Sequence, residues 1–439
     1  MAWRVKRPRG GLWGHPDFMK LWIGQSISEF GTQVSELAIP LVAVVALKAS
    51  AFEVASLGTV QFLPFILFTL PAGVWVDRVS RRMVLIVGDA GRALLLISIP
   101  LAYFLDALTL GQLYAVGFGV GILTVLFDVA YQSYLPSLVE REQLVEGNAK
   151  LQTTVSGAWI AGPGLAGLLI GAITAPYAIL VDAVSFVVSG GFTAVIRRRE
   201  RLPARTEQRP RMRTELWEGL RYVLGHRLLR PQAISTGVSN FFSNVAFSIF
   251  VVYAVRTLHL SPAEIGVAFT GFGIGWLLGS VSATRLGTRL GVGPATMLGA
   301  ALSGPGTLLV AVSPRGFPLP LIIAGGIVGG FGAVVYNIQQ VSLRQTITPE
   351  RLQGRMNSVM RFLVWGTIPL GSLTGGALAS TIGLRETLVV GAIGGFTSVL
   401  PIIFSPIRAL EGFPEPEPDL EPFEPGVIPP APMPAAPDA

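Results

Sequence analysis

The sequence contains no cysteine and only three histidines. Without Cys there can be no disulfide, thiolate metal site or cysteine nucleophile, and His15, His226 and His259 lie far apart along the chain. No residues form the set of nucleophile, base and orienting partner that an enzyme's active site requires. We therefore expect no metal ion, no cofactor and no enzymatic activity.

Charge is also scarce. Charged residues make up 13% of the chain and hydrophobic residues 51%, with a mean hydropathy of +0.59, whereas a soluble domain is about 25% charged. The net charge of +7 comes from Arg and Lys between apolar runs, and no basic motif with interleaved aromatics indicates nucleic-acid binding. The composition predicts a membrane protein whose partner is the lipid bilayer and not a nucleic acid.

Long apolar runs make up most of the chain. A spanning helix needs roughly 20 apolar residues, because a helix rises about 1.5 Å per residue and the hydrocarbon core is about 30 Å thick. The sequence therefore predicts an all-α integral membrane protein with twelve transmembrane helices. The predicted spans cover residues 18–47, 52–76, 83–105, 111–136, 147–173, 176–196, 231–256, 262–284, 294–313, 317–343, 355–381 and 385–407.

Basic residues predict the orientation of these spans. The connections after odd-numbered spans hold only Lys48, Arg256, Arg315 and Arg385, which leaves 29 of the 33 Lys and Arg residues (33 − 4) on the other side. Cytoplasmic connections carry the excess of basic residues. We therefore expect a multi-pass protein of the cell (inner) membrane with both termini in the cytoplasm.

A long Arg-rich segment divides the spans six and six. The two halves also repeat features, since Pro163 and Pro369 lie 206 residues apart (369 − 163). Two six-span repeats joined by a linker can open alternately to either side of a membrane. The predicted divisions are a basic N-terminus (1–16), an N-terminal six-helix bundle (17–196), a cytoplasmic linker (197–230), a C-terminal six-helix bundle (231–408) and a disordered, Pro-rich acidic tail (409–439).

The stretch "GVWVDRVSRR" puts four charges directly after the second span. It resembles the G-x-x-x-D-R-x-G-R-K signature of the major facilitator superfamily, with Ser80 in place of the second Gly. The resemblance implies two pseudo-symmetric six-helix bundles and a cytoplasmic latch, in which Asp77 lies near a helix N-terminus and couples to Arg81. The latch residues implied are Gly73, Asp77, Arg78, Arg81, Arg82 and, through pairing with the Arg81 region, Asp128.

The fifth span contains "GAWIAGPGLAG", which resembles the antiporter signature G-x-x-x-G-P-x-x-G-G at Gly162, Pro163 and Gly167. The run "LTVLFDVAYQSYLPSLVEREQLVEGNAKL" resembles the drug/proton antiporter branch of the superfamily, which includes macrolide-efflux and enterobactin-export proteins. In many exporters of the superfamily the fourth span carries an Arg in a proton-linked motif. Residues 114–136 contain no Arg or Lys, so this chain departs from that coupling route.

Acids within spans are functional candidates, because a charge in the membrane is costly. Glu29 and Glu36 lie seven residues apart on the first span and therefore share a helix face. Either is a candidate to carry a proton or bind a cationic substrate; the alternative is that they form salt bridges or face a wet vestibule. Asp89 and Arg92, three residues apart, are expected to form a local pair, and Asp182 is expected to be structural.

Polar residues also follow one another at helical spacing on the seventh and tenth spans. The resemblance implies that these helices line a cavity, but small polar residues also hold membrane helices together, by about 0.6 kcal/mol each, and both interpretations stay open. The Gly-rich run "GFGIGWLLG" (271–279) predicts close helix packing and not a dinucleotide loop, because no strand precedes it. The candidate substrate residues are Asn240, Asn244, Tyr336, Asn337 and Gln340.

These features together predict a secondary active transporter. We expect a monomer that exports a small amphipathic or hydrophobic compound by alternating access, with protons as the coupling ion. The alternatives are a siderophore, metabolite or lysophospholipid carrier of the same fold, and a transport-inactive membrane sensor or assembly partner. A voluminous aromatic cavity would favour drugs, and a ring of Arg would favour anions.

Overall fold

The computed structural model describes residues 11–76, 78–140, 143–197 and 212–414, where it has twelve helical segments long and apolar enough to cross a membrane. Each corresponds to a predicted span, with ends that differ by a few residues, and the expected all-α membrane fold is confirmed. The predicted disordered tail from residue 415 and most of the basic N-terminus lie outside the described residues. The N-half consists of α1 (Pro16–Leu41), α2 (Ala51–Val76), α3 (Arg81–Phe104), α4 (Leu110–Leu138), α5 (Leu144–Ile173) and α6 (Ala175–Ala194).

The C-half contains six further spans, three of which are built from two helices. They are α8 (Leu229–Arg256), α9 (Pro262–Leu290), α10 (Val292–Ala301) with α11 (Ser303–Ala311), α12 (Leu319–Ile347), α13 (Glu350–Trp365) with α14 (Thr367–Thr381), and α15 (Leu384–Thr397) with α16 (Leu400–Ile403).

Prolines explain the three interrupted spans. In each, the first helix ends four residues before a proline, which has no N–H to donate to the carbonyl at that position. The freed carbonyl ends the regular hydrogen-bond ladder, and the next helix begins after a gap of one residue in two of the spans and of two residues before α16. The three pairs of last helical residue and proline are Ala301 and Pro305, Trp365 and Pro369, and Thr397 and Pro401.

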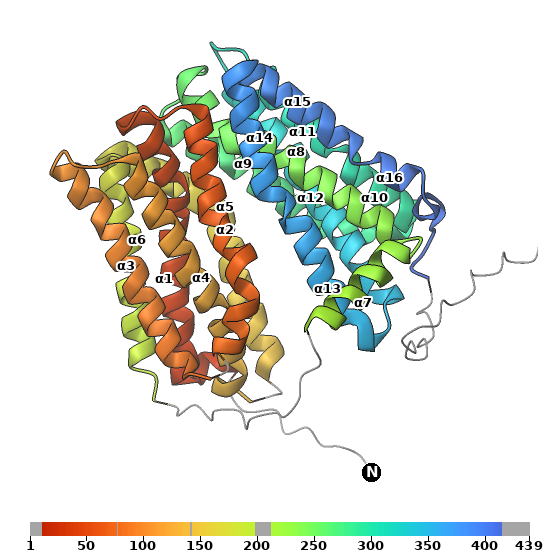
Figure 1. The fold of residues 1–439 in the computed structure, drawn as a ribbon, viewed down its shortest axis with the longest axis horizontal. Helices are drawn as coiled ribbons and strands as arrows, with labels where there is room; N and C mark the ends of the chain where they lie inside the picture. The colour runs from red at the N-terminus through yellow and green to blue at the C-terminus, as the bar shows by residue number, and fades with distance from the viewer. Residues whose placement is uncertain (1–10, 77, 141–142, 198–211, 415–439) are drawn as a thin grey trace, which may run out of the picture.

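The two halves meet at one end of the molecule. The far end is the end at which the connections near residues 47–50, 105–109 and 257–261 lie. The linker end is the opposite end, where α7 (Met212–Gly225) and the N-terminal end of α1 lie. The helices of the two halves converge at the far end and diverge toward the linker end (Figure 1).

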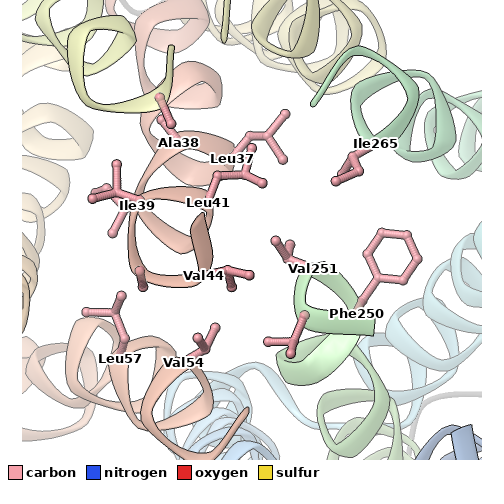
Figure 2. Packing of buried hydrophobic residues seen from close by; sticks show 14 of the residues in the cluster. Leu37, Ala38, Ile39, Leu41, Val44, Val54, Leu57, Phe250, Val251 and Ile265 are labelled. Atoms are coloured by element: carbon pink, nitrogen blue, oxygen red, sulfur yellow. The ribbon is translucent and has the colours of Figure 1, made fainter. Parts of the chain in front are cut away.

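Buried apolar residues show the same asymmetry. At the far end, Leu41 and Val44 of the N-half and Phe250, Val251 and Ile265 of the C-half belong to a single cluster (Figure 2). At the linker end the buried residues form separate clusters, one confined to the N-half and the others to the C-half. The described chain is thus closed at the far end, and its halves have separate cores at the linker end.

Two helix contacts join the halves, and the pseudo-two-fold symmetry between the halves relates one contact to the other. The fifth span packs on the eighth (α5 on α9), and the second packs on the eleventh (α2 on α14). A Cβ added to Gly167 of α5 would lie 2.5 Å from the Pro262 carbonyl oxygen and 2.9 Å from Gly266 Cα. Such backbone-to-backbone contact requires Gly on both helices.

The predicted packing role of residues 271–279 is confirmed. A Cβ on Gly271 would lie 2.8 Å from the Ile323 carbonyl oxygen, and one on Gly275 would lie 2.8 Å from Ile327 Cα, both on α12. The Gly-rich run therefore allows α9 and α12 to pack closely.

The linker includes a helix docked on the C-half. α7 packs on α13, where Glu218 forms an ion pair with Arg355. A Cβ on Gly219 would lie 2.9 Å from the Arg355 carbonyl oxygen, so the two helices are in close contact.

Candidate transport site

Acids are concentrated in the membrane-spanning part of the N-half. Five lie about two helical turns or more from the ends of their spans, and the one base at that depth in the described N-half spans is Arg92. By the same criterion the described C-half spans contain no acid and one base, Arg361. The five acids are Glu29, Glu36, Asp89, Asp128 and Asp182.

Arg92 is held at the junction of α3, α4 and α6. Its side chain pairs with Asp89 at 2.6 Å, and both are buried. The guanidinium carbon lies 4.2 Å from the ring centre of Phe127 on α4 and 4.1 Å from that of Phe186 on α6. Aromatic faces attract a desolvated cation by about 2 kcal/mol, so the two rings fix the position of the charge.

Arg92 also acts on acids beyond Asp89. Its charge reaches Glu29 on α1, Asp128 on α4 and Asp182 on α6. The pair predicted as local is present, but it is also the positive centre of a network over four helices. The predicted pairing of Asp128 with the Arg81 region stays a prediction.

A cavity of 520 Å³ lies beside this network, between α1, α4 and α5. Glu29 lines it and accepts a hydrogen bond from Gln25 at 3.2 Å. Sequence reasoning missed most of its walls, although Asn148 and Gln152 show the same i,i+4 polar spacing on α5 as Gln25 and Glu29 on α1. The lining residues are Gln25, Ser26, Glu29, Tyr131, Gln132, Asn148, Ala149, Leu151, Gln152, Thr154 and Val155.

The second predicted acid of α1 lies outside this cavity lining. Glu36 is exposed and accepts a hydrogen bond from Gln33 Nε2 at 3.2 Å. It repels Glu29 electrostatically, in keeping with the predicted common helix face. Asp182 is 1% exposed and accepts a hydrogen bond from Ser185 at 3.1 Å, at a site where Gly31 of α1 packs on α6.

The latch residues lie at the linker end of the N-half. Asp77 is outside the described residues, Arg78 is exposed, and Arg81 begins α3. Ser80, the departure from the signature, accepts a hydrogen bond from the Met83 amide at 3.4 Å and so caps α3. Among the described residues outside its own helix turn, no atom lies within 4 Å of a Cβ added to Gly73, so this glycine makes no close helix contact in this conformation.

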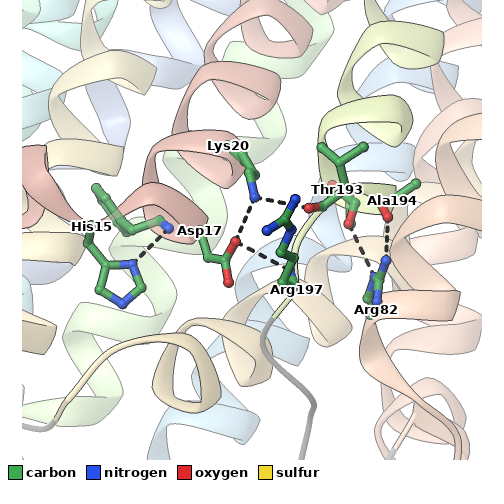
Figure 3. A network of polar contacts seen from close by, with 9 residues as sticks. His15, Asp17, Lys20, Arg82, Thr193, Ala194 and Arg197 are labelled. Atoms are coloured by element: carbon green, nitrogen blue, oxygen red, sulfur yellow. Dashed lines mark hydrogen bonds and ion pairs between the residues drawn. The ribbon is translucent and has the colours of Figure 1, made fainter.

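Arg82 joins α3 to the end of α6. It donates from Nε to the Thr193 carbonyl at 3.2 Å and from a terminal nitrogen to the Ala194 carbonyl (Figure 3). Lys20 donates to the nearby Val195 carbonyl at 3.0 Å and to Asp17 at 2.8 Å. Cations at a helix C-terminus satisfy carbonyls that have no helical donor.

Replacing Arg82 with Gln should lower stability slightly, because a cation at a helix C-terminus contributes about 0.3–1 kcal/mol. Thermal unfolding of the purified protein in detergent measures this, with Arg82→Lys as the charge-conserving control. If Arg82 also belongs to a latch, transport should fall far more than stability does. If transport falls only in proportion to stability in both variants, Arg82 has no role in a latch.

The antiporter-type residues are packing residues in this conformation. A Cβ on Gly162 would lie 2.5 Å from Gln33 Cγ on α1. Pro163 and Gly167 face Gly266 of α9, in the contact between the halves. The motif therefore lies where α5 packs closely on α1 of its own half and on α9 of the opposite half.

Of the predicted polar residues of the C-half, Tyr336 and Asn240 make hydrogen bonds between helices, whereas Asn244 and Gln340 make theirs within their own helix. The Tyr336 hydroxyl on α12 lies 2.7 Å from Thr236 Oγ1 on α8, and Asn240 donates to the Val364 carbonyl on α13 at 3.3 Å. Asn244 donates to the Asn240 carbonyl at 2.8 Å. Gln340 donates to Asn337 at 3.3 Å, and of these two only Asn337 is exposed.

The sequence is similar to known transporters over most of its length. The family model described as "Transmembrane secretion effector" matches residues 13–423. The multidrug efflux pump Tap of Mycolicibacterium fortuitum is 30% identical over 361 residues, which cover 78% of this chain and 84% of the pump. The enterobactin exporter EntS of Salmonella typhi is 24% identical over 395 residues, covering 88% and 90%.

The fold is similar to that of solved transporters. A bacterial homologue of the iron transporter ferroportin in its inward-facing state superposes with a TM-score of 0.72 at 18% identity, covering 88% of this chain and 98% of the homologue. The outward-facing state of such a homologue gives a TM-score of 0.54 over the same coverage. These likenesses establish the fold.

Proposed function

Because the chain belongs to the transmembrane secretion effector family of major facilitator transporters, we propose that it exports a small amphipathic or hydrophobic compound in exchange for protons. It is a multi-pass membrane transporter related to drug efflux pumps and to an enterobactin exporter, and not an enzyme. The proposal adds the direction of transport, the coupling ion and the orientation of the protein in the membrane. The linker end faces the cytoplasm, where most Arg and Lys are expected.

The acid network around Arg92 carries the proposal. Intramembrane acids form proton relays in transporters, and here Glu29 joins the network to a cavity that has both polar and apolar walls and can receive an amphipathic substrate. The closed far end and the separate cores at the linker end fit one state of an alternating cycle, open to the cytoplasm. Protonation of Glu29 would weaken its attraction to Arg92 and thereby link proton binding to the packing of α1, α3 and α4.

The test separates coupling from transport. Glu29→Gln keeps the size of the side chain but cannot exchange a proton, so the variant should lose export driven by a pH gradient while still exchanging substrate across vesicles without a gradient. Both rates are measured in the same proteoliposomes, with a substrate found by profiling compounds that accumulate in a deletion strain. Glu36→Gln and the double variant complete the series.

Glu53→Gln is the matched control, since Glu53 lies at the far-end start of α2 and accepts hydrogen bonds from Ser50. The Glu53→Gln variant should keep both the export driven by a pH gradient and the substrate exchange without a gradient. If the double variant with Gln at positions 29 and 36 exports substrate against a gradient at the same rate as the parent, the acids of α1 do not carry the coupling proton. Absence of efflux driven by a pH gradient in the parent protein would refute proton-coupled export.

A siderophore carrier is the second candidate function. The enterobactin exporter matches 88% of the chain, and export of a siderophore would use the same alternating cycle. Metabolite profiling of the deletion strain in iron-poor medium separates the two candidates. If the protein exports a siderophore, cells that lack it should accumulate an iron chelator, and otherwise they should not.

A further inference from the structure

The linker helix α7 carries a stripe of exposed residues on the side opposite its contact with the C-half. Trp217, Arg221 and Leu224 are spaced i, i+4 and i+7, so they share one helix face, and all three are exposed. Trp217 is 67% exposed and Leu224 is 43% exposed. On the other face, Gly219 and Val223 are buried against α13. The described part of the chain therefore covers one face of α7 and leaves the stripe uncovered.

This stripe lies at the level of the lipid headgroups. The eleventh span, Leu352–Thr381, has 30 residues and is about 45 Å long, whereas the hydrocarbon core is about 30 Å thick. The linker-end start of α13 is the charged run "ERLQGR", and Gly219 of α7 packs on Arg355 within this run (Figure 1). Trp13, at the same end of the N-half, is 59% exposed. Because Trp concentrates at membrane interfaces, exposed Trp residues in both halves mark the same depth.

The charge around the stripe is positive. Among residues 217–230, whose side chains the structure describes, Arg221, Arg227 and Arg230 are exposed, and the one acid, Glu218, forms an ion pair with Arg355. The sequence directly before α7 has the same sign, since residues 197–211 contain seven Arg and two Glu. A basic amphipathic helix with Trp on its apolar side is typical of helices that bind anionic membrane surfaces.

We propose that α7 binds anionic phospholipids in the membrane leaflet at the linker end. Trp217 and Leu224 lie against the upper part of the acyl chains, and the guanidinium of Arg221 binds the lipid phosphate, whose geometry its donors match. Arg221 lies between the two apolar residues along the stripe, so its aliphatic part covers apolar surface while its charge reaches the headgroups. Exposed Arg residues attract a lipid of net negative charge more strongly than a zwitterionic one.

A single fluorescent label can report which lipid lies beside α7, because the chain has no Cys. Gly225 follows Leu224, is exposed, and has no atom outside its own helix turn within 4 Å of an added Cβ, so the label is attached at Gly225→Cys. The full-length protein is placed in nanodiscs of equal parts phosphatidylcholine and phosphatidylglycerol, and a trace of either lipid carries a spin label that quenches fluorescence. Phosphatidylglycerol should be preferred beside the label by roughly fivefold, the effect of one Arg near an anionic surface.

Arg221→Gln should remove most of this preference. Arg289→Gln is the matched control, since it removes an exposed Arg from the last turn of α9 at the same end of the C-half, and it should leave the preference unchanged. In the labelled protein with Arg221 intact, 1 M salt should also weaken the preference, because it shortens the Debye length to about 3 Å. The salt measurement needs no further substitution and therefore stays informative if Arg221→Gln does not fold.

Three results would overturn the proposal. Equal quenching by the two lipids would show that α7 does not select anionic lipid. The absence of quenching by either lipid would show that α7 does not lie on the membrane. A change in fluorescence caused by soluble polyglutamate, without quenching by lipid, would assign the surface to an acidic protein partner. The lipid contact is independent of the proposed export, so a protein that shows the lipid preference but no efflux driven by a pH gradient would refute only proton-coupled export.

Discussion

Replacing Arg92 with Gln should reduce stability by about 3–5 kcal/mol, because removal of one partner of a buried ion pair leaves the other charge without compensation. Asp89 is fully buried, and Arg92 also attracts Glu29, Asp128 and Asp182. The substitution also removes the cation between two aromatic rings. Transport should be abolished, because the acid network loses its positive centre.

A comparison with Asp89→Asn distinguishes a network from a local pair. If Arg92 serves several acids, Arg92→Gln should destabilise the protein clearly more than Asp89→Asn, and the double variant should recover only part of the loss. Thermal unfolding in detergent gives these differences, with Arg289→Gln as an exposed control that removes the same charge. Equal effects of the two single variants with full recovery in the double would show that the pair is only local.

Adding one methyl group at Gly167 should open the far end. The new Cβ would lie 2.5 Å from the Pro262 carbonyl oxygen and 2.9 Å from Gly266 Cα, both backbone atoms of α9 that cannot move independently. Overpacking of this kind is unfavourable by about 1–3 kcal/mol, which is enough to shift the balance between the two states by roughly tenfold. The closed far end should therefore be depopulated in Gly167→Ala.

Gly171 provides the matched control. It lies one turn further along α5, and no atom lies within 4 Å of its added Cβ, so Gly171→Ala should leave the balance unchanged. Spin labels on Ala107→Cys and Phe317→Cys, at exposed far-end positions of the two halves, report the separation of the halves. A label distance distribution for Gly167→Ala that matches the parent would contradict a role for this contact in closing the far end.

Much of the architecture follows from local sequence. Twelve apolar runs long enough for a bilayer determine twelve helices, since a chain in lipid must satisfy its backbone groups within each helix. Three C-half spans break four residues before a proline, because its missing N–H leaves the carbonyl at that position without a donor. Proline alone does not determine a break, since Pro64 and Pro163 lie inside continuous helices. The common face of Glu29 and Glu36 follows equally from helical periodicity.

The site depended on contacts between helices that no local pattern encodes. Asp89 and Arg92 look like a local pair in the sequence; only the packing of α3 against α4 and α6 gives Arg92 two aromatic neighbours and brings distant acids within reach of its charge. Helix formation is set by neighbours along the chain, whereas electrostatic coupling depends on distances in space, which tertiary packing alone decides.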